Sequence, residues 1–121
     1  MYELTIEREF CAAHAIVING EQEQLHGHNW RVRVAVRSEG LDSDGLVCDF
    51  HDLERSIDAT IGAWNNAYLN DTPPFDHVNP TAEHVAREIA RGIAGSLPAN
   101  VRIHRVSVTE APGCEAAYLP D

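Results

Sequence analysis

Two stretches near the N-terminus alternate strictly between apolar and polar residues, and this alternation constrains the fold more than any other feature. In residues 2–14 one parity is almost entirely apolar and ends in a histidine, comprising Leu4, Ile6, Phe10, Ala12 and His14. In residues 26–37 the apolar parity begins with two histidines, comprising His26, His28, Trp30, Val32, Val34 and Val36. Because successive side chains leave opposite faces of a strand, each stretch predicts a strand with one apolar face.

The middle of the chain changes to helical spacing. Apolar residues recur three and four positions apart in a first predicted helix that Asp49 is suited to cap, at Phe50, Leu53, Ile57, Ile61 and Trp64. A second helix is expected to take Asn79 as its N-cap and Pro80 as its first residue, and to stop at Gly95. It would bury a second apolar stripe, at Ala82, Val85, Ala86, Ile89 and Ile93.

Residues 101–110 and 115–119 are predicted to be two closing strands around the turn Ala111-Pro112-Gly113. The order β-β-α-α-β-β predicts an α+β fold in which two helices cover one face of an antiparallel sheet. At 121 residues, we expect positions 1–121 to form one domain. The other sheet face and the sheet edges would be uncovered, which favours assembly of several copies into a closed barrel. The alternative is a monomer with one solvated sheet face.

Composition argues against several classes of partner. The net charge is −10 and the chain has no lysine, whereas binding to a phosphate backbone demands clustered cations, so we expect no nucleic-acid partner. No apolar run approaches the roughly 20 residues of a membrane helix, and the first residues lack the basic start of a signal peptide. We therefore expect a cytoplasmic protein with no membrane partner. Three widely spaced cysteines without a C-x-x-C motif predict neither a disulfide framework nor a cysteine-based zinc site.

Three histidines form a candidate metal site. On a strand, His26 and His28 leave the same face, and His14 ends the preceding predicted strand. Three imidazoles with one open position are the usual plan of a catalytic zinc site, so we predict Zn²⁺ on these residues. The alternative is that the H-x-H pair consists of two ordinary polar residues at the start of a strand.

Several motifs occur in an order that resembles a known family, the 6-pyruvoyl-tetrahydropterin and 6-carboxy-tetrahydropterin synthases. They span essentially the whole chain: Phe10-Cys11-Ala12-Ala13-His14, Leu25-His26-Gly27-His28-Asn29-Trp30, Val47-Cys48-Asp49-Phe50-His51-Asp52-Leu53, Tyr68-Leu69-Asn70-Asp71, Asn79-Pro80-Thr81-Ala82-Glu83 and Val106-Ser107-Val108-Thr109-Glu110. The resemblance implies the tunnelling fold (T-fold), in which three subunits close a barrel and two barrels stack into a homo-hexamer. It also implies zinc on the three histidines and a pterin pocket between subunits.

Glu110 is the candidate substrate-binding residue. The resemblance implies that Glu110 holds the ring nitrogens of the pterin. The chemistry of the side chain agrees, because a carboxylate accepts two parallel N–H bonds from a 2-amino-pyrimidinone edge. The alternative is an exposed glutamate on a surface strand.

The sequence departs from this family at its proton-transfer residues. The family has a cysteine four residues before the first histidine of the H-G-H run, and here that position is Gln22. The family's Asp-His pair is replaced by Asn65 and Asn66. Asparagine does not titrate in the useful range and cannot serve as a general base. The ordinary synthase reaction is therefore expected to fail or to be very slow.

Three other residues are candidates for the missing chemistry. Cys11 has the opposite strand parity to His14, so its thiol is not expected to replace the lost one. His77 follows Asp76 in a proline-rich loop, eleven residues after the position of the family's histidine. Glu23 is the better candidate because it stands in Glu-x-x-His-Gly-His, three residues before His26.

Glu23 resembles the glutamate of a branch of the family that lacks the cysteine. That branch cleaves the side chain of dihydroneopterin triphosphate and leaves 6-hydroxymethyl-dihydropterin, a folate precursor. In such a reaction zinc polarises the side-chain hydroxyls, and a carboxylate takes the proton that starts carbon–carbon cleavage. The alternative is that Glu23 is a solvated acid in the polar loop 21–24.

The sequence leaves two main functions open. The first is a zinc-dependent lyase acting on a dihydropterin, with Glu23 as its base. The second is a catalytically impaired homologue that binds a pterin or purine. A third, a structural zinc domain, is disfavoured by the open fourth position of a three-histidine site. Arg31 and Arg33 are of the other parity from the histidines, and serve either a neighbouring subunit's pocket or surface ion pairs.

Overall fold

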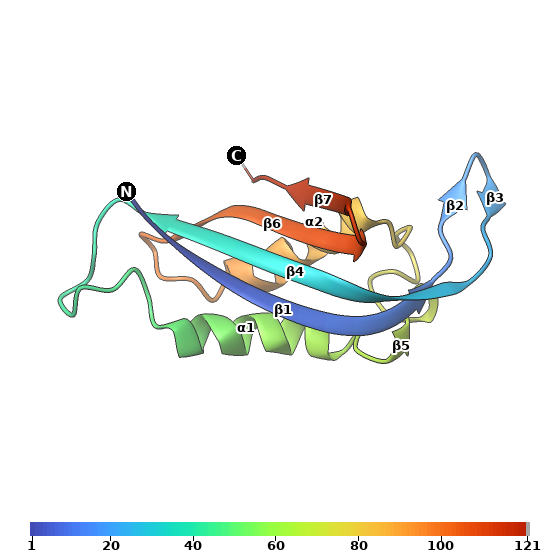
Figure 1. Ribbon diagram of the computed structural model, residues 1–121. Coiled ribbons are helices and arrows are strands. Elements are labelled where there is room, and N and C mark those ends of the chain that lie inside the picture. The colour runs from blue at the N-terminus through green and yellow to red at the C-terminus, as the bar shows by residue number, and fades with distance from the viewer. Residues whose placement is uncertain (121) are drawn as a thin grey trace.

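The sheet and its helices follow the predicted order. The computed structural model describes residues 1–120 (Figure 1). Four strands pair antiparallel in one sheet: β1 (Tyr2–His14), β4 (His26–Ser38), β6 (Arg102–Ala111) and β7 (Cys114–Tyr118). A short strand, β5 (Ala67–Tyr68), adds to β1 in parallel, so the sheet is mixed and has the order β5-β1-β4-β6-β7.

Both helices lie on one face of the sheet, as the sequence predicts. Helix α2 (Ala82–Ala94) packs on β6 and β7, and α1 (Phe50–Gly62) packs on α2 and β1 (Figure 1). A short 3-10 helix, η1 (Leu69–Asp71), follows β5 and contacts β1. Within residues 1–120, no helix combines the length and the apolar character that crossing a membrane requires. The α+β fold class predicted from the sequence is therefore confirmed.

The start of α1 is as predicted and the start of α2 is not. Asp49 caps α1 by accepting a hydrogen bond from the backbone N–H of His51. The prediction that Asn79 caps α2 and that Pro80 is its first residue is wrong: Thr81 is the N-cap and accepts from the N–H of His84, and the helix begins at Ala82. The Asn79 side chain is instead bonded to the backbone of Val17, far away in the sequence.

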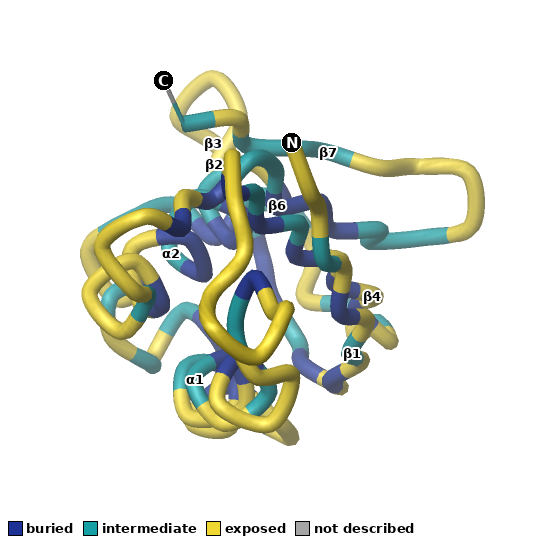
Figure 2. Tube along the Cα trace, turned by 90° about the vertical axis from the view of Figure 1, so that its left-hand side faces the viewer, coloured by how far each residue is buried: buried dark blue, intermediate teal, exposed yellow. Residues whose placement is uncertain are grey.

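The core lies between the sheet and the helices, where Figure 2 shows the buried segments. The predicted apolar parity of β1 and β4 faces the helices, and Phe10 stacks on its cross-strand partner Trp30 with ring centroids 5.8 Å apart. In α1, Leu53, Ile57 and Ile61 are buried, whereas Phe50 is exposed, contrary to its predicted place in the apolar stripe. The whole predicted stripe of α2 is buried.

A small hairpin lies between β1 and β4. Strands β2 (Val17–Ile18) and β3 (Glu21–Gln22) pair antiparallel around Asn19 and Gly20, whose φ angles are 54° and 80°. Positive φ at both central residues is the type I′ pattern, and Asn-Gly is its preferred sequence. Figure 1 shows this hairpin projecting from the end of the sheet that is remote from the N-terminus.

Candidate metal centre

The three histidines converge at one end of the sheet. His14 is the last residue of β1 and lies directly opposite His26, the first residue of β4, while His28 follows on the same face. The Nε2 atoms of His14 and His26 are 3.1 Å apart. The ring centroids are separated by 4.6 Å for His14–His26, 5.2 Å for His14–His28 and 4.6 Å for His26–His28. Strand parity predicts only that the histidines share one face of the sheet. The antiparallel pairing of β1 with β4 brings them into contact.

Backbone carbonyls set the tautomers of two of these rings. His14 Nδ1 lies 2.8 Å from the Pro80 carbonyl oxygen, and His26 Nδ1 lies 2.9 Å from that of Gln24. A carbonyl only accepts, so each Nδ1 carries a proton, and in the neutral ring the Nε2 atom keeps its lone pair. Two lone pairs that face each other at 3.1 Å repel unless a cation lies between them. Such second-shell carbonyls are typical of metal-bound histidines.

His28 completes the nitrogen set. Its Nε2 atom is buried and makes no hydrogen bond of regular geometry within the described residues, although Glu110 Oε1 lies 3.2 Å away. Burial lowers the pKa of His28, an effect that Glu110 opposes and the other two imidazoles reinforce, so the neutral ring is favoured. A buried nitrogen without a well-formed hydrogen bond calls for an explanation, and a bound metal ion would supply one.

Glu110 brings a carboxylate into the same cluster from β6. Its Oε1 atom lies 2.7 Å from His14 Nε2, 3.2 Å from His28 Nε2 and 3.8 Å from His26 Nε2. One ligand atom from each of these four residues lies within 4.8 Å of the others. The sequence assigned Glu110 to the pterin ring and gave no sign of this proximity, which depends on the pairing of β6 with β4. Its role in binding a pterin stays a prediction.

The donor set fits zinc. Zn²⁺ takes imidazole nitrogens at about 2.0–2.1 Å and carboxylate oxygens at similar distances, and tetrahedral geometry then puts two nitrogens about 3.3 Å apart. The observed separation of 3.1 Å between His14 and His26 is close to this value. His14 is fully buried and His28 mostly so, while the His26 side chain is 37% exposed. The centre is therefore walled by protein on one side and open on the other.

Glu23 lies beside this centre. Its Oε1 atom accepts a hydrogen bond from the backbone N–H of Ile16 at 3.1 Å and is 3.7 Å from His26 Nε2. The Glu23 side chain is 32% exposed, so it is neither a freely solvated loop acid nor a buried one. Its role as a base stays a prediction.

Two asparagine side chains hold the segment between β1 and the hairpin. Asn70 Oδ1 accepts from the Ala15 N–H at 2.9 Å, and Asn70 Nδ2 donates to the Ala15 carbonyl at 2.7 Å. Asn79 makes the same paired contacts with Val17, both at 2.9 Å. Each side-chain amide thus makes the pair of hydrogen bonds that the backbone of a neighbouring strand would make. The motifs that contain Asn70 and Asn79 were visible in the sequence, but this role in holding the segment next to His14 was not.

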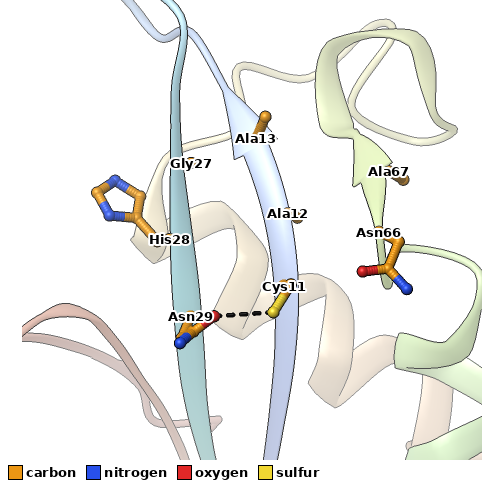
Figure 3. A pocket seen from close by; sticks show the side chains of 8 residues that line it. All are labelled: Cys11, Ala12, Ala13, Gly27, His28, Asn29, Asn66 and Ala67. Carbon is orange, nitrogen blue, oxygen red and sulfur yellow. Dashed lines mark hydrogen bonds between the residues drawn. The ribbon is translucent and has the colours of Figure 1, made fainter.

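Asn65 and Asn66, which replace the family's Asp-His pair, bind the edge of β1. Asn65 Oδ1 accepts from the Cys11 N–H at 3.0 Å, and the Asn66 N–H donates to the Cys11 carbonyl at 2.6 Å. Cys11 faces away from the histidines, as its parity predicts, and its thiol donates to Asn29 Oδ1 at 2.8 Å (Figure 3). Cys11, Asn29 and Asn66 border a pocket of about 490 Å³ that also reaches His28. Within the described residues, this region offers no replacement for the missing acid-base pair.

Gln22 and His77 lie outside the cluster. Gln22 is exposed at the end of β3. The His77 side chain is 88% exposed and lies 3.6 Å from Asp76 at the surface. Of the residues considered for proton transfer, only Glu23 is near the histidines.

Comparisons with known proteins identify the family of the chain. The family model of 6-pyruvoyl tetrahydropterin synthase matches residues 3–121. Dihydroneopterin monophosphate aldolase of Pyrococcus furiosus is 37% identical over 101 residues, covering 84% of this chain and 82% of that protein. The 6-carboxy-5,6,7,8-tetrahydropterin synthase of Synechocystis is 32% identical over 126 residues, covering 98% of this chain and 94% of that protein.

The solved structures extend the agreement to the fold. The 6-pyruvoyl tetrahydropterin synthase of Caenorhabditis elegans superposes with a TM-score of 0.82, covering 100% of this chain and 98% of that chain at 22% identity. At that identity the likeness concerns the fold, which is the T-fold that the sequence motifs imply. The match to the family model over nearly the whole chain, together with these relatives, shows that the chain belongs to the 6-pyruvoyl tetrahydropterin synthase family.

Proposed function

We propose that this protein is a zinc-dependent lyase that cleaves the side chain of a 7,8-dihydroneopterin phosphate, with Glu23 as general base. The observation that carries this proposal is the Glu23 carboxylate, held 3.7 Å from His26 beside a cluster of three imidazoles. The relative named dihydroneopterin monophosphate aldolase supports this class of reaction. The sequence motifs imply the triphosphate as substrate, and other dihydroneopterin phosphates differ from it only in the tail.

His14, His26 and His28 would hold the zinc. When bound, the metal would supply positive charge that makes a side-chain hydroxyl of the substrate more acidic. The two backbone carbonyls behind His14 and His26 fix those rings with their Nε2 atoms toward one point. This orientation costs no rearrangement when the ion binds.

Glu23 would move the proton. One of its oxygens is engaged by Ile16, which leaves the other free to accept the proton of the hydroxyl on C2′. The bond between C1′ and C2′ then breaks, C2′ becomes an aldehyde carbon, and the electron pair passes into the pterin ring. Return of the proton to C1′ gives 6-hydroxymethyl-dihydropterin and a two-carbon aldehyde that keeps the phosphate.

Glu110 would bind the pterin ring. Its Oε1 atom lies close to the Nε2 atoms of His14 and His28. A bound zinc ion would compete with this carboxylate for the same nitrogen atoms. The side chain is 28% exposed and can accept two N–H bonds from the 2-amino-pyrimidinone edge. Binding in this way would place the side chain of the substrate next to the metal centre.

A second candidate function is a pterin- or purine-binding homologue without synthase or lyase activity. It is favoured by Asn65 and Asn66, which bind the edge of β1 where the family carries an acid-base pair. Both functions require pterin binding, but only the lyase forms a product. One experiment therefore separates them.

That experiment incubates the zinc-loaded protein with 7,8-dihydroneopterin triphosphate and with the monophosphate, and follows the products by mass. Release of 6-hydroxymethyl-dihydropterin that disappears in Glu23→Ala supports the lyase. The matched control is Glu21→Ala, because Glu21 is an exposed acid in the same hairpin. Pterin binding at micromolar concentration without any product would support the binding protein. Absence of metal after zinc addition would contradict the zinc centre in either function.

We also propose that residues 1–121 form one domain and that six copies assemble as the T-fold implies. Two sheet edges are open within residues 1–120, because β5 covers β1 only at Ala12 and Ala13, and β7 pairs only with β6. Strand pairing between copies would cover both edges. Sedimentation at several concentrations tests this, and a monomer throughout would contradict it. The cytoplasmic location expected from the sequence stays a prediction.

A further inference from the structure

One arginine beside the metal centre has no acidic partner. All nine basic residues are arginines, and within residues 1–120 only Arg31 and Arg102 make no ion pair. The other seven each lie close to a carboxylate: Arg8, Arg33, Arg37, Arg55, Arg87, Arg91 and Arg105. In a chain with nineteen acidic residues, a free guanidinium needs an explanation.

Other arginines of β4 form ion pairs with the glutamates opposite them on β1, whereas Arg31 does not. On the sheet face away from the helices, Arg33 pairs with Glu7 at 3.4 Å and Arg37 pairs with Glu3 at 2.7 Å. Glu9 lies opposite Arg31 in the same register, yet no ion pair forms between them. Arg31 therefore keeps its planar set of N–H donors available at the surface.

Arg31 lines a pocket that also reaches the metal centre. This pocket has a volume of about 470 Å³, and its polar lining is made by Glu9, Arg31, Thr109, Asn29, His28 and Glu110. Thr109 lies directly opposite Arg31 in the pairing of β4 with β6, and Asn29 is two residues before Arg31 on the same face. The guanidinium thus stands with a hydroxyl and an amide at one side of a space whose other side is the candidate zinc site.

We propose that Arg31, with Thr109 and Asn29, binds the terminal phosphate of the substrate and selects a phosphate monoester over a triphosphate. This proposal rests on the proposed function, because it assigns the tail of the same substrate. A guanidinium takes a phosphate through two parallel N–H bonds, and Thr and Asn side chains supply further donors. A monoester carries a charge of about −1.5 to −2, which one arginine and two neutral donors suit.

The surroundings oppose a longer anion. Arg31 also borders a neighbouring pocket of about 610 Å³, which adds the carboxylates of Glu7 and Glu115 to that of Glu9, a residue that lines both pockets. Its other two arginines, Arg8 and Arg33, are already paired with acids. Additional phosphates that extended past Arg31 would approach these carboxylates without a free cation to neutralise them. The charge pattern therefore favours the monophosphate tail.

Binding of unreactive ligands tests the subsite without turnover. The zinc-loaded full chain is titrated with neopterin, neopterin 3′-monophosphate, neopterin 3′-triphosphate and inorganic phosphate, by calorimetry. We expect the monophosphate to bind at least about tenfold tighter than neopterin, as a charge-assisted pair predicts. The triphosphate should bind more weakly than the monophosphate. Inorganic phosphate should bind weakly and should compete with the monophosphate.

Arg31→Gln should remove the preference for the monophosphate and leave the affinity for neopterin unchanged. Arg102→Gln is the matched control, because Arg102 is also exposed and unpaired but lies at the other end of β6. The proposal is overturned if Arg31→Gln keeps the preference, if it weakens neopterin equally, or if the triphosphate binds tighter than the monophosphate. These results are independent of cleavage: phosphate selectivity without product contradicts the lyase and keeps the subsite. Equal cleavage of 7,8-dihydroneopterin with and without a phosphate contradicts the subsite alone.

Discussion

The carboxylate of Glu23 accepts a hydrogen bond from the backbone N–H of Ile16 at 3.1 Å, and the Glu23 N–H returns one to the Ile16 carbonyl at 2.9 Å. These two bonds close the base of the β2–β3 hairpin. The same carboxylate oxygen lies 3.7 Å from His26. The hairpin therefore fixes the position of Glu23 relative to the histidines.

Replacing Glu23 by Gln should separate the chemical role of this side chain from its structural one. The amide oxygen of Glu23→Gln still accepts from Ile16, but the side chain no longer takes a proton. We expect zinc content to stay unchanged and the rate of side-chain cleavage to fall about 10²–10⁴-fold. Quenched-flow product analysis and metal analysis measure the two effects. Glu21→Gln should keep the full rate, and a Glu23→Gln rate within about twofold of the wild-type rate would rule out this residue as the base.

The hydrogen bonds of Asn70 and Asn79 to the backbone should contribute differently to the stability of the protein. Asn70 bonds to Ala15, which is 1% exposed, whereas Asn79 bonds to Val17, which is 46% exposed. Asn70→Ala leaves buried backbone groups unpaired, at a cost of about 1–3 kcal/mol each, while water replaces the partners lost in Asn79→Ala. Urea unfolding should therefore show a clearly larger loss for Asn70→Ala. Equal losses would mean that burial of Ala15 does not decide the effect.

His28 should stabilise the protein only through the metal. Its Nε2 atom is buried and makes no hydrogen bond of regular geometry, so His28→Ala should not lower the stability of the metal-free protein by more than the loss of ring packing and of the 3.2 Å contact with Glu110. Zinc at about 100 times its Kd should stabilise the wild type by about 2.7 kcal/mol and should have little effect on His28→Ala. Thermal unfolding with and without zinc measures this. His77→Ala, a change at an exposed histidine, should keep the full zinc effect.

The close approach of the two helices should make Gly92 intolerant of a side chain. A Cβ atom at Gly92 would lie 2.6 Å from both Cγ2 and Oγ1 of Thr60. The clash in Gly92→Ala should lower the free energy of unfolding by about 1–3 kcal/mol. The higher helix propensity of alanine offsets about 1 kcal/mol of this loss. Thr60→Ala should restore stability in the double variant. Gly62→Ala, where no atom lies within 4 Å, should be neutral or stabilising, and the same result at Gly92 would contradict the clash.

The ion pairs between β1 and α1 should contribute to acid sensitivity. Arg8 hydrogen-bonds to Glu54 and, at 2.8 Å, to Asp58, and its bond to Glu54 lowers the pKa of that carboxyl below its usual 4.5. A lowered pKa in the folded state contributes stability above the unfolded pKa, and this contribution is lost as the pH falls through the folded value. The wild type should therefore lose more stability than Arg8→Gln between about pH 6 and about pH 3. Parallel pH profiles in urea unfolding would contradict this.

Much of the fold was predictable because its signals are local. The period-two alternation of residues 2–14 and 26–37 predicted β1 and β4, and helical spacing with Asp49 predicted α1. The N-cap of α2 was mispredicted because Asn79 hydrogen-bonds to Val17, 62 residues away, and no local signal reports a contact at that separation. Phe50 fits the apolar period but is the first residue of the helix, where it stays 49% exposed.

The sequence by itself determined the parity of the histidines, the family and the absence of the usual cysteine and Asp-His pair, because these depend only on residue identity and spacing. The tertiary structure decided which groups meet. Strand register puts His14 opposite His26, the pairing of β6 with β4 brings Glu110 to them, and the hairpin brings Glu23. It also decided that Arg31 alone near this centre is unpaired, since an ion pair depends on distances in space that the order of residues does not contain.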